Sequence, residues 1–302
     1  MRTIYGDDLF DALRPDWEAD QAAQLDTWTS GSDIATMVAV NNDDLVVGVV
    51  VMSHETSTGM SNILMIAVHP DEQGNGVGRR LLSEALADLS AAGAAYVEAY
   101  VRDFPGHEVA RVLLRSEGFE SRAVQPTLLY RTAEHPGRMA IRPAGVRPID
   151  DADVEQCVRF GLEAFRAVYA SFENLYGPEL FVRIEPDWEA SQASYIRSAI
   201  TDPDDEAWVY EVDGEPAGFV VVKMDDHGVA DIDLLAVDPK RQGNGIGSTL
   251  NRFAFDRCQE ASMEFVVVAT ANDEGHAPAR RSYERAGFEP MAIQWDLQIK
   301  RL

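Results

Sequence analysis

The sequence has few cysteines and no long apolar run. Among its 302 residues only Cys157 and Cys258 are cysteines, with no CxxC pair and no cluster of cysteine with histidine. This pattern argues against a disulfide framework and against a zinc or other metal site, so we expect both thiols to lie in the core. No stretch approaches the roughly 18 apolar residues that span a bilayer, and the N-terminal residues lack the apolar segment of a signal peptide. We therefore expect a cytoplasmic protein with no membrane partner.

Positive charge is also scarce. The chain has 51 Asp and Glu against 26 Lys and Arg, which gives a formal net charge of −25, and its lysines are Lys223, Lys240 and Lys300. Such a surface repels nucleic acid and anionic membranes, so we expect no nucleic-acid partner. The same charge would steer a cationic substrate, but acidic, lysine-poor surfaces also suit a salt-rich cytoplasm or plain solubility. We favour the latter explanation over steering.

One pattern occurs twice along the chain. Tyr5–Ala22 matches Tyr176–Ala193 at a constant offset of 171, with eleven of the eighteen positions identical. Asn62–Phe119 matches Asp231–Phe288 at an offset of 169 without a gap. Internal repetition of this length predicts two copies of one domain.

The two copies differ in length at the front. We place the first at residues 1–134 and the second at 139–302, with the join in the Pro- and Gly-containing stretch Thr132–Gly145. The second copy has a strand-like segment and an Asp-capped amphipathic helix before its "YG" at Tyr176, whereas the first copy has its "YG" at Tyr5. The first copy is therefore predicted to lack the first strand and first helix of the domain.

Each copy contains a glycine-rich loop between a predicted strand and a predicted helix, within an overall α/β pattern. The loops are "QGNGVG" at Gln73–Gly78 and "QGNGIG" at Gln242–Gly247. Glycines allow close approaches that a Cβ forbids, so several N–H groups can converge on an anion at the positive end of the helix. Such a loop suits a pyrophosphate. The Gly-Lys-Ser/Thr of a Walker loop and the GxGxxG of a dinucleotide fold are absent, which argues against both nucleotide sites.

The loop and the helix that closes the domain together carry a family resemblance. "LAVDPKRQGNGIGSTL" followed by "ARRSYERAGF" resembles the GCN5-related N-acetyltransferases (GNAT), with their Q/R-x-x-G-x-G/A coenzyme A loop and Y-x-x-x-G-F closing helix. Both copies share the resemblance, and two such domains in one chain are similar to mycothiol synthase and related tandem acetyltransferases. The resemblance implies, in each copy, a mixed and mostly antiparallel sheet flanked by helices, and acetyl-CoA as the acyl donor.

The resemblance also implies which residues hold the cofactor. In the family the fourth and fifth strands splay apart, pantetheine lies in the gap, and the loop amides bind the pyrophosphate. Asn272 and His276 fall near the pantetheine, although His276 recurs as His107 in the first copy, which favours packing or capping over catalysis. The implied cofactor-binding set is completed by Leu235, Ala236, Val237, Arg241, Gln242, Gly243, Asn244, Gly245, Ile246, Gly247 and Ser248.

Acyl transfer to an amine needs a base and benefits from an acid. An amine with a pKa near 10.4 is almost wholly protonated at pH 7, so a carboxylate must take its proton, and an acid assists the departing thiolate. By resemblance, Asp231 is the base and Tyr283 the acid, with Asp233 or a water chain as the alternative base. The first copy has Asn62 and Leu114 at these positions. We therefore predict that the second copy catalyses, while the first is a structural or ligand-binding relic.

The acceptor is less well defined. Phe165, Tyr169 and Phe172 are candidates for its binding wall, although aromatic residues at helical spacing are more often core. A small-molecule amine, a peptide or protein N-terminus and a mycothiol-like amino sugar stay open as acceptors. A non-enzymatic acyl-CoA sensor or assembly module is the alternative function. Such a module would not need both Asp231 and Tyr283, so we favour the enzyme.

Overall fold

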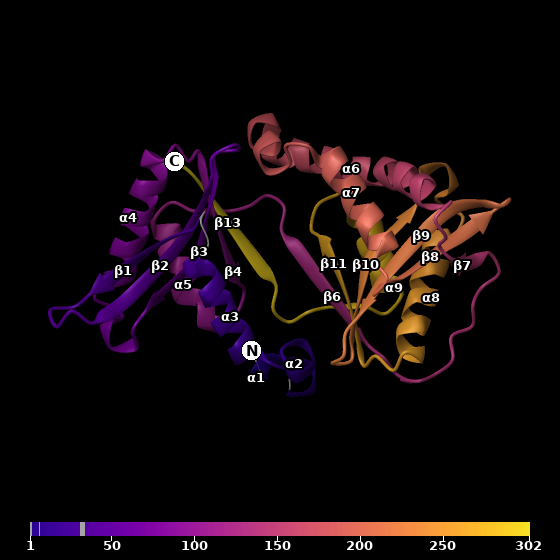
Figure 1. The fold of residues 1–302 in the computed structure, drawn as a ribbon, viewed down its shortest axis with the longest axis horizontal. Helices are drawn as coiled ribbons and strands as arrows, with labels where there is room; N and C mark the ends of the chain where they lie inside the picture. The colour runs from indigo at the N-terminus through magenta and orange to yellow at the C-terminus, as the bar shows by residue number, and fades with distance from the viewer. Residues whose placement is uncertain (1, 6, 31–33) are drawn as a thin grey trace. The chain divides into compact units, whose positions relative to one another are not determined.

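The chain folds into two compact units, seen here in a computed structural model (Figure 1) that describes all residues except 1, 6 and 31–33. The first unit contains residues 16–125, 182–186 and 293–302, and the second unit contains residues 1–15, 126–181 and 187–292. Each has its own sheet.

The second unit is built on a sheet with the strand order β12-β6-β11-β10-β9-β8-β7. Neighbouring strands are antiparallel except β10 and β11, which are parallel. This confirms the expected mixed, mostly antiparallel sheet. Its strands are β6 (Pro126–Thr132), β7 (Val146–Pro148), β8 (Glu206–Val212), β9 (Glu215–Met224), β10 (Val229–Val237), β11 (Phe265–Ala271) and β12 (Glu289–Pro290).

Helices cover both faces of this sheet, and alternation along β9 separates the two cores. Val220 and Val222 pack in the cluster that α8 completes, while Phe219 and Val221 pack in the cluster of α6 and α7. The helices are α1 (Arg2–Tyr5), α2 (Asp7–Leu13), α6 (Val154–Ile184, kinked at Gly177), α7 (Trp188–Thr201), α8 (Ile246–Glu260) and α9 (Ala277–Arg285). Both cysteines are buried and free, as expected.

The first unit has the strand order β1-β2-β3-β4-β13-β5, again with one parallel pair, β3 and β4. Among its described residues no strand corresponds to β7 and no helix to the first half of α6, which confirms the predicted difference between the copies. The elements are β1 (Ile34–Val40), β2 (Val46–Glu55), β3 (Met60–Val68), β4 (Tyr96–Arg102), β5 (Glu120–Ser121), β13 (Trp295–Arg301), α3 (Trp17–Ser30), α4 (Val77–Ala91) and α5 (Glu108–Ser116).

The two copies exchange a strand. β6 follows the first copy along the chain but pairs with β11 in the second unit, and β13 ends the second copy but pairs with β4 in the first unit. Figure 1 shows this as a yellow strand among purple ones and a magenta strand beside orange ones. The predicted domains, 1–134 and 139–302, describe the sequence repeats. A linear division cannot express the exchange, because a strand's own residues do not specify its partner.

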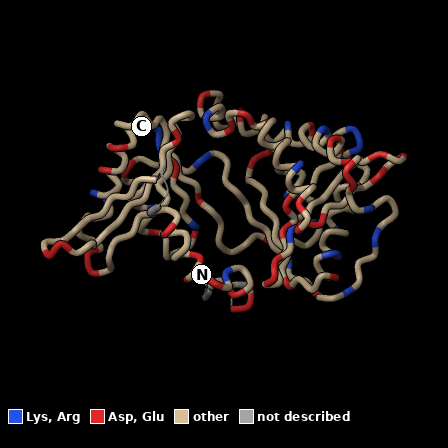
Figure 2. Tube along the Cα trace, in the orientation of Figure 1, with Lys and Arg blue, Asp and Glu red and all other residues tan. Residues whose placement is uncertain are grey.

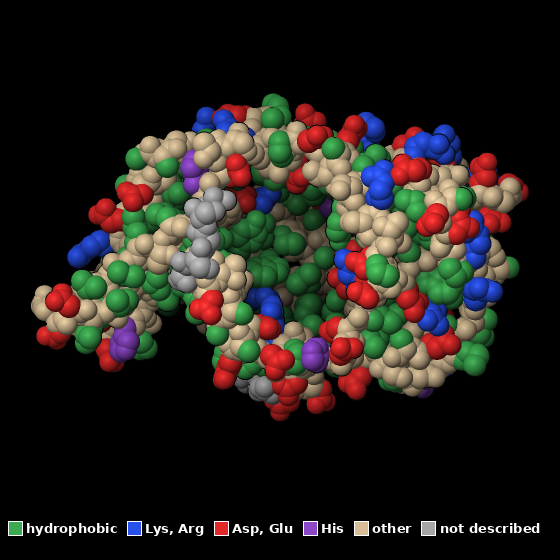
Figure 3. Space-filling view, viewed as in Figure 1, with side chains coloured by type: hydrophobic (Ala, Val, Ile, Leu, Met, Phe, Trp, Pro, Cys, Tyr) green, Lys and Arg blue, Asp and Glu red, His purple; other side chains and the backbone are tan. Residues whose placement is uncertain are grey.

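Acidic residues occur throughout both units (Figure 2) and are scattered over the face that Figure 3 presents. Among the described residues, no helix combines the length and the apolarity that a membrane crossing requires.

Candidate functional site

In each unit the two strands of the parallel pair separate partway along their length. β10 and β11 pair at Val229, Ala230 and Asp231, after which β10 continues to Val237 without further pairing to β11. In the first unit β3 and β4 pair from Met60 to Ile63 and then part in the same way. The splayed strands that the resemblance implied are therefore present twice.

A glycine loop follows the splayed strand in both units. In the second unit Gly245 precedes α8 with a φ of 81° and makes no side-chain capping bond; in the first, Gly76 precedes α4 with a φ of 79°. The first N–H groups of a helix lack intrahelical partners and sit at its positive end. The loop therefore presents unpaired donors to an anion.

The space in front of each loop fits a phosphate group. A Cβ built on Gly243 or Gly245 would meet no atom within 4 Å, and the same holds for Gly74 and Gly76. A side chain at any of these positions would enter that space, so the glycines keep it open. Both loops thus fit the pyrophosphate of coenzyme A.

Some of the expected cofactor residues shape the second loop from behind. Gln242 donates through Nε2 to the carbonyl of Val237 at 3.2 Å, and Asn244 donates through Nδ2 to the carbonyl of Arg241 at 3.0 Å. Arg241 also lies 3.7 Å from a carboxylate oxygen of Asp213. These bonds fix the loop, so its backbone amides remain the groups best placed for a phosphate.

Asp231 is the carboxylate at the point where the strands part. Its Oδ1 atom is buried and has no hydrogen-bond partner among the described residues. Burial raises the pKa of this carboxyl to about 6; the charge of Asp233 adds to the rise and Lys223 opposes it. A buried, unsatisfied carboxylate with a pKa near 6 can accept a proton at neutral pH.

Asp233, the alternative base, is already engaged. It lies at a bulge in β10, where Tyr195 donates its hydroxyl to Oδ1 at 2.5 Å and the Nζ atom of Lys223 lies 3.2 Å from Oδ2. Lys223 is also 3.9 Å from Asp205. The sequence analysis missed Tyr195, Lys223 and Asp205; the one available signal was that Lys223 is among three lysines in an acidic chain.

Tyr283 lies on α9 with its ring in the core. Its side chain is 6% exposed and contacts Phe288 edge-on, with ring centroids 5.6 Å apart. Burial, and then the charge of Asp231, raise the pKa of the hydroxyl above its ordinary value. This buried position is compatible with packing and with a role as the acid.

The segment after β11 places the two remaining cofactor candidates. His276 shares a short hydrogen bond with Asp273, with 2.5 Å between Nδ1 and Oδ1, and stacks on Phe172 with ring centroids 5.7 Å apart. It precedes α9 but makes no side-chain capping bond. Asn272 is exposed. The contacts of His276 are those of a packing residue.

The three acceptor candidates on α6 divide into two environments. Phe165 packs against the core formed with α7 and β9. Tyr169 and Phe172 instead form a partly exposed aromatic cluster, in which Tyr169 stacks on Trp188 with centroids 4.2 Å apart. Trp188, whose counterpart in the first copy is Trp17, belongs to this cluster.

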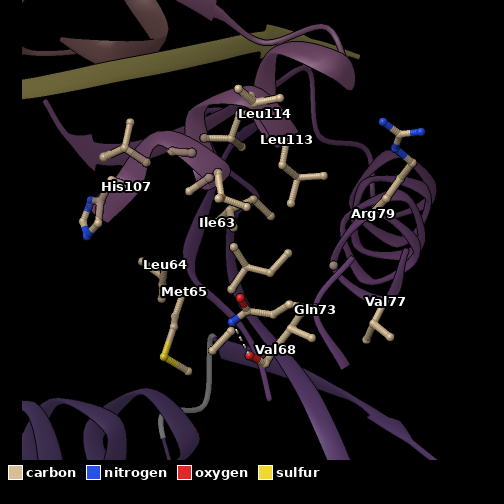
Figure 4. A pocket seen from close by; sticks show the side chains of 18 of the residues that line it. Ile63, Leu64, Met65, Val68, Gln73, Val77, Arg79, His107, Leu113 and Leu114 are labelled. Carbon is tan, nitrogen blue, oxygen red and sulfur yellow. Dashed lines mark hydrogen bonds between the residues drawn. The ribbon is translucent and has the colours of Figure 1, made fainter. Parts of the chain in front are cut away.

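The first unit encloses a cavity of about 920 Å³ at its own cleft (Figure 4). Gln73, which donates to the carbonyl of Val68 at 3.0 Å, lies on one side of the view, and Leu113 and Leu114 lie on the other. The cavity continues to the α3 residue Trp28. In the first copy Leu64 and Leu114 line this cavity, at the positions where the second copy has Asp233 and Tyr283.

Comparisons with known proteins agree with this architecture. The model of the acetyltransferase (GNAT) family matches residues 169–288, and that of the acetyltransferase (GNAT) domain matches residues 32–121. The mycothiol acetyltransferase of Clavibacter sepedonicus is 30% identical over 271 residues, covering 88% of this chain and 80% of that protein. The mycothiol acetyltransferase of Nocardioides sp. is 26% identical over 247 residues, covering 79% and 80%.

Solved structures share the fold across most of the chain. A GCN5-related N-acetyltransferase from Sphaerobacter thermophilus has a TM-score of 0.58 at 20% identity, covering 94% of this chain and 88% of that one. A tandem GNAT protein from the clavulanic acid biosynthesis pathway has a TM-score of 0.54 at 18% identity, covering 90% and 84%. With the relatives and family models above, the chain belongs to the GNAT family, as an N-acetyltransferase with two tandem GNAT domains.

Proposed function

We propose that this enzyme transfers an acetyl group from acetyl-CoA to a primary amine, and that the second unit performs the reaction. The observation that carries the proposal is Asp231, a buried carboxylate with an unsatisfied oxygen at the point where β10 and β11 part. The first unit has Asn62 there, which cannot take a proton.

Asp231 accepts the proton of the acceptor's ammonium group. With a pKa of about 6 the carboxylate is mostly ionised at pH 7, and its burial makes it a stronger base than an exposed aspartate. Tyr195 donates to Asp233 and Lys223 lies 3.2 Å from it, so of these two carboxylates Asp231 is the less engaged.

Tyr283 gives a proton to the sulfur of the leaving group. An acid must be protonated before it acts, and burial raises the pKa of this hydroxyl, so it holds its proton at neutral pH. Leu114, at the matching position of the first copy, has no proton to give.

The glycine loop and the splayed strand hold the donor. The amides around Gly243 and Gly245 bind the pyrophosphate, and the backbone of Leu235, Ala236 and Val237 meets pantetheine. When bound, acetyl-CoA supplies an activated acetyl thioester. The protein's own part is to position that thioester, keep water from it and move two protons.

The acceptor is a small-molecule amine. The name of the relatives, mycothiol acetyltransferase, makes an amino-sugar amine of the mycothiol type the first compound to test. Tyr169 and Phe172 provide the aromatic surface against which such an acceptor packs. The acidic surface of the chain favours a cation over an anion.

The test is acetyl transfer from acetyl-CoA to a panel of primary amines, followed by thiol release and by the mass of the product. The wild type should acetylate at least one amino sugar. Gly245→Glu places a side chain in the space in front of the second glycine loop and should abolish transfer. Binding of acetyl-CoA to the variant is measured in parallel. Full transfer by the Gly245→Glu variant would place the reaction elsewhere and refute the proposal.

A further inference from the structure

The cavity of the first unit has a second set of features that acetyl transfer in the second unit does not use. At one end lie Gly74 and Gly76, whose positive φ angles and open surroundings make the same phosphate cradle as in the second unit. Its volume of about 920 Å³ is near the upper end of the range of small-molecule sites, about 300–1,000 Å³. The cavity therefore has room for more than a phosphate group.

Several positions of the lining are aliphatic where the second copy has polar side chains. At the offset of 169, Asp233, Ser282 and Tyr283 correspond to cavity-lining leucines. Arg281 likewise corresponds to Val112, which also lines the cavity. The leucines are Leu64, Leu113 and Leu114. Loss of activity alone does not explain this, because Asp233 and Arg281 are not the proposed base or acid.

Helix α3 explains how the cavity extends. Its residues Gln21, Leu25 and Trp28 follow helical spacing and line the cavity together. In α7 the residue matching Leu25 is Ile196, which is fully buried beside α6, whereas Leu25 is 39% exposed. Since the described first unit has no counterpart of that part of α6, the apolar side of α3 lines a cavity instead of a core.

The charges beside the first glycine loop weaken its attraction for a phosphate group. Asp71 and Glu72 precede the first loop and Arg79 and Arg80 follow it, so their charges cancel, whereas Lys240 and Arg241 precede the second loop. Arg79 is further drawn to Glu117, with 3.5 Å between Nε and Oε1. Binding in the first unit must therefore draw more of its free energy from apolar contact.

We propose that the first unit binds a coenzyme A thioester whose acyl chain is apolar and longer than acetyl, and that it holds this ligand without transferring the chain. The loop meets the pyrophosphate, and the chain lies against Leu64, Leu114 and Trp28. An acetyl group would leave most of this surface in water. Asn62 and Leu114 offer neither base nor acid, so the thioester persists.

Calorimetric binding to the full chain tests the proposal, with octanoyl-CoA, acetyl-CoA and octanoate as ligands. Each buried methylene strengthens binding about fourfold, so octanoyl-CoA should bind the first unit at least about tenfold more tightly than acetyl-CoA. Octanoate alone lacks the pyrophosphate and should bind at least about tenfold more weakly than its thioester. Equal affinity for the two thioesters, or tight binding of octanoate alone, would overturn the proposal.

Matched variants locate the site. Gly76→Glu and Gly245→Glu place the same side chain at glycines with φ angles of 79° and 81°, so they impose the same backbone strain. Gly76→Glu should remove the tight octanoyl-CoA site, and Gly245→Glu should leave it in place. The opposite result would assign the ligand to the second unit and refute the proposal without touching the assignment of catalysis.

A third variant provides a control in case Gly76→Glu does not fold. Leu64→Asp introduces the residue that the second copy has at this position, and Leu64 is only partly buried. It should cut octanoyl-CoA affinity at least about tenfold while acetyl-CoA affinity stays within about twofold. Mass spectrometry of octanoyl-CoA incubated with an amine and the Gly245→Glu variant should find the thioester intact; octanoyl transfer there would contradict the non-catalytic role.

Discussion

The two units share one scaffold but differ in the chemical groups beside it. Both have the parting strands, the glycine loop and the closing helix, but the second has Asp231 and Tyr283 at the two positions where the first has Asn62 and Leu114. The scaffold that holds a coenzyme A thioester and the groups that use it are therefore carried by different residues. One set can persist after the other has changed.

Removing the base should have the largest effect on the difference in activity between the two units. Asp231→Asn keeps the shape of the side chain but cannot take a proton, so acetyl transfer should fall about 10²- to 10⁴-fold in kcat/KM. Steady-state thiol release at pH 7.5 measures the loss. Asn62→Asp, the reciprocal change at the matching position of the first copy, is the control and should leave transfer unchanged. Activity within about threefold of wild type in Asp231→Asn would shift the base to another group.

Removing the acid should have a smaller effect. A thiol has a pKa near 8.5, so a thiolate departs fairly well without help, and Tyr283→Phe should lower kcat about 10- to 100-fold. The ring stays in its packing against Phe288, so the melting temperature should change little. A drop in stability with unchanged kcat would show that Tyr283 only packs.

Much of this architecture could be predicted from the sequence. The repeat, the glycine loops and the shorter first copy all depend on local patterns, which a constant offset makes visible. The strand exchange could not be predicted. β6 and β13 occupy matching positions in the two copies, and nothing in their own residues indicates which of the two sheets each will join. Register and pairing are tertiary choices.

The site shows the same limit. Gly243 and Gly245 were expected from their spacing, since glycine adopts the left-handed conformation before a helix without steric cost. Tyr195 and Lys223 were not, because they reach Asp233 from α7 and β9, far apart in the sequence.

Stability separates a catalytic Asp231 from a structural one. The folded pKa of about 6 lies above the ordinary 3.8, so the folded state binds the proton more tightly and stability falls as pH rises through this window. Asp231→Asn removes the buried charge and should raise the free energy of unfolding by about 3 kcal/mol at pH 8 and by about half of that at pH 5.

Denaturant unfolding of the variant and the wild type at both pH values measures this difference. A residue retained for packing would show the reverse, a loss of stability on substitution. The gain in stability together with the loss of activity is typical of a group kept for function at a structural cost. Asn62→Asp should move stability in the opposite direction, because it buries a charge in the first unit.

The finest test concerns the neighbours of Asp231. The charge of Asp233 raises the pKa of Asp231 and that of Lys223 lowers it, so the acidic limb of kcat/KM, expected near pH 6, should move to lower pH in Asp233→Asn and to higher pH in Lys223→Met. Profiles between pH 5 and 9, with an amine that titrates above this range, measure the limb. Opposite shifts in the two variants assign it to Asp231. Shifts in the same direction would point to a general change in the site, and an unmoved limb would mean that the base lies outside this network.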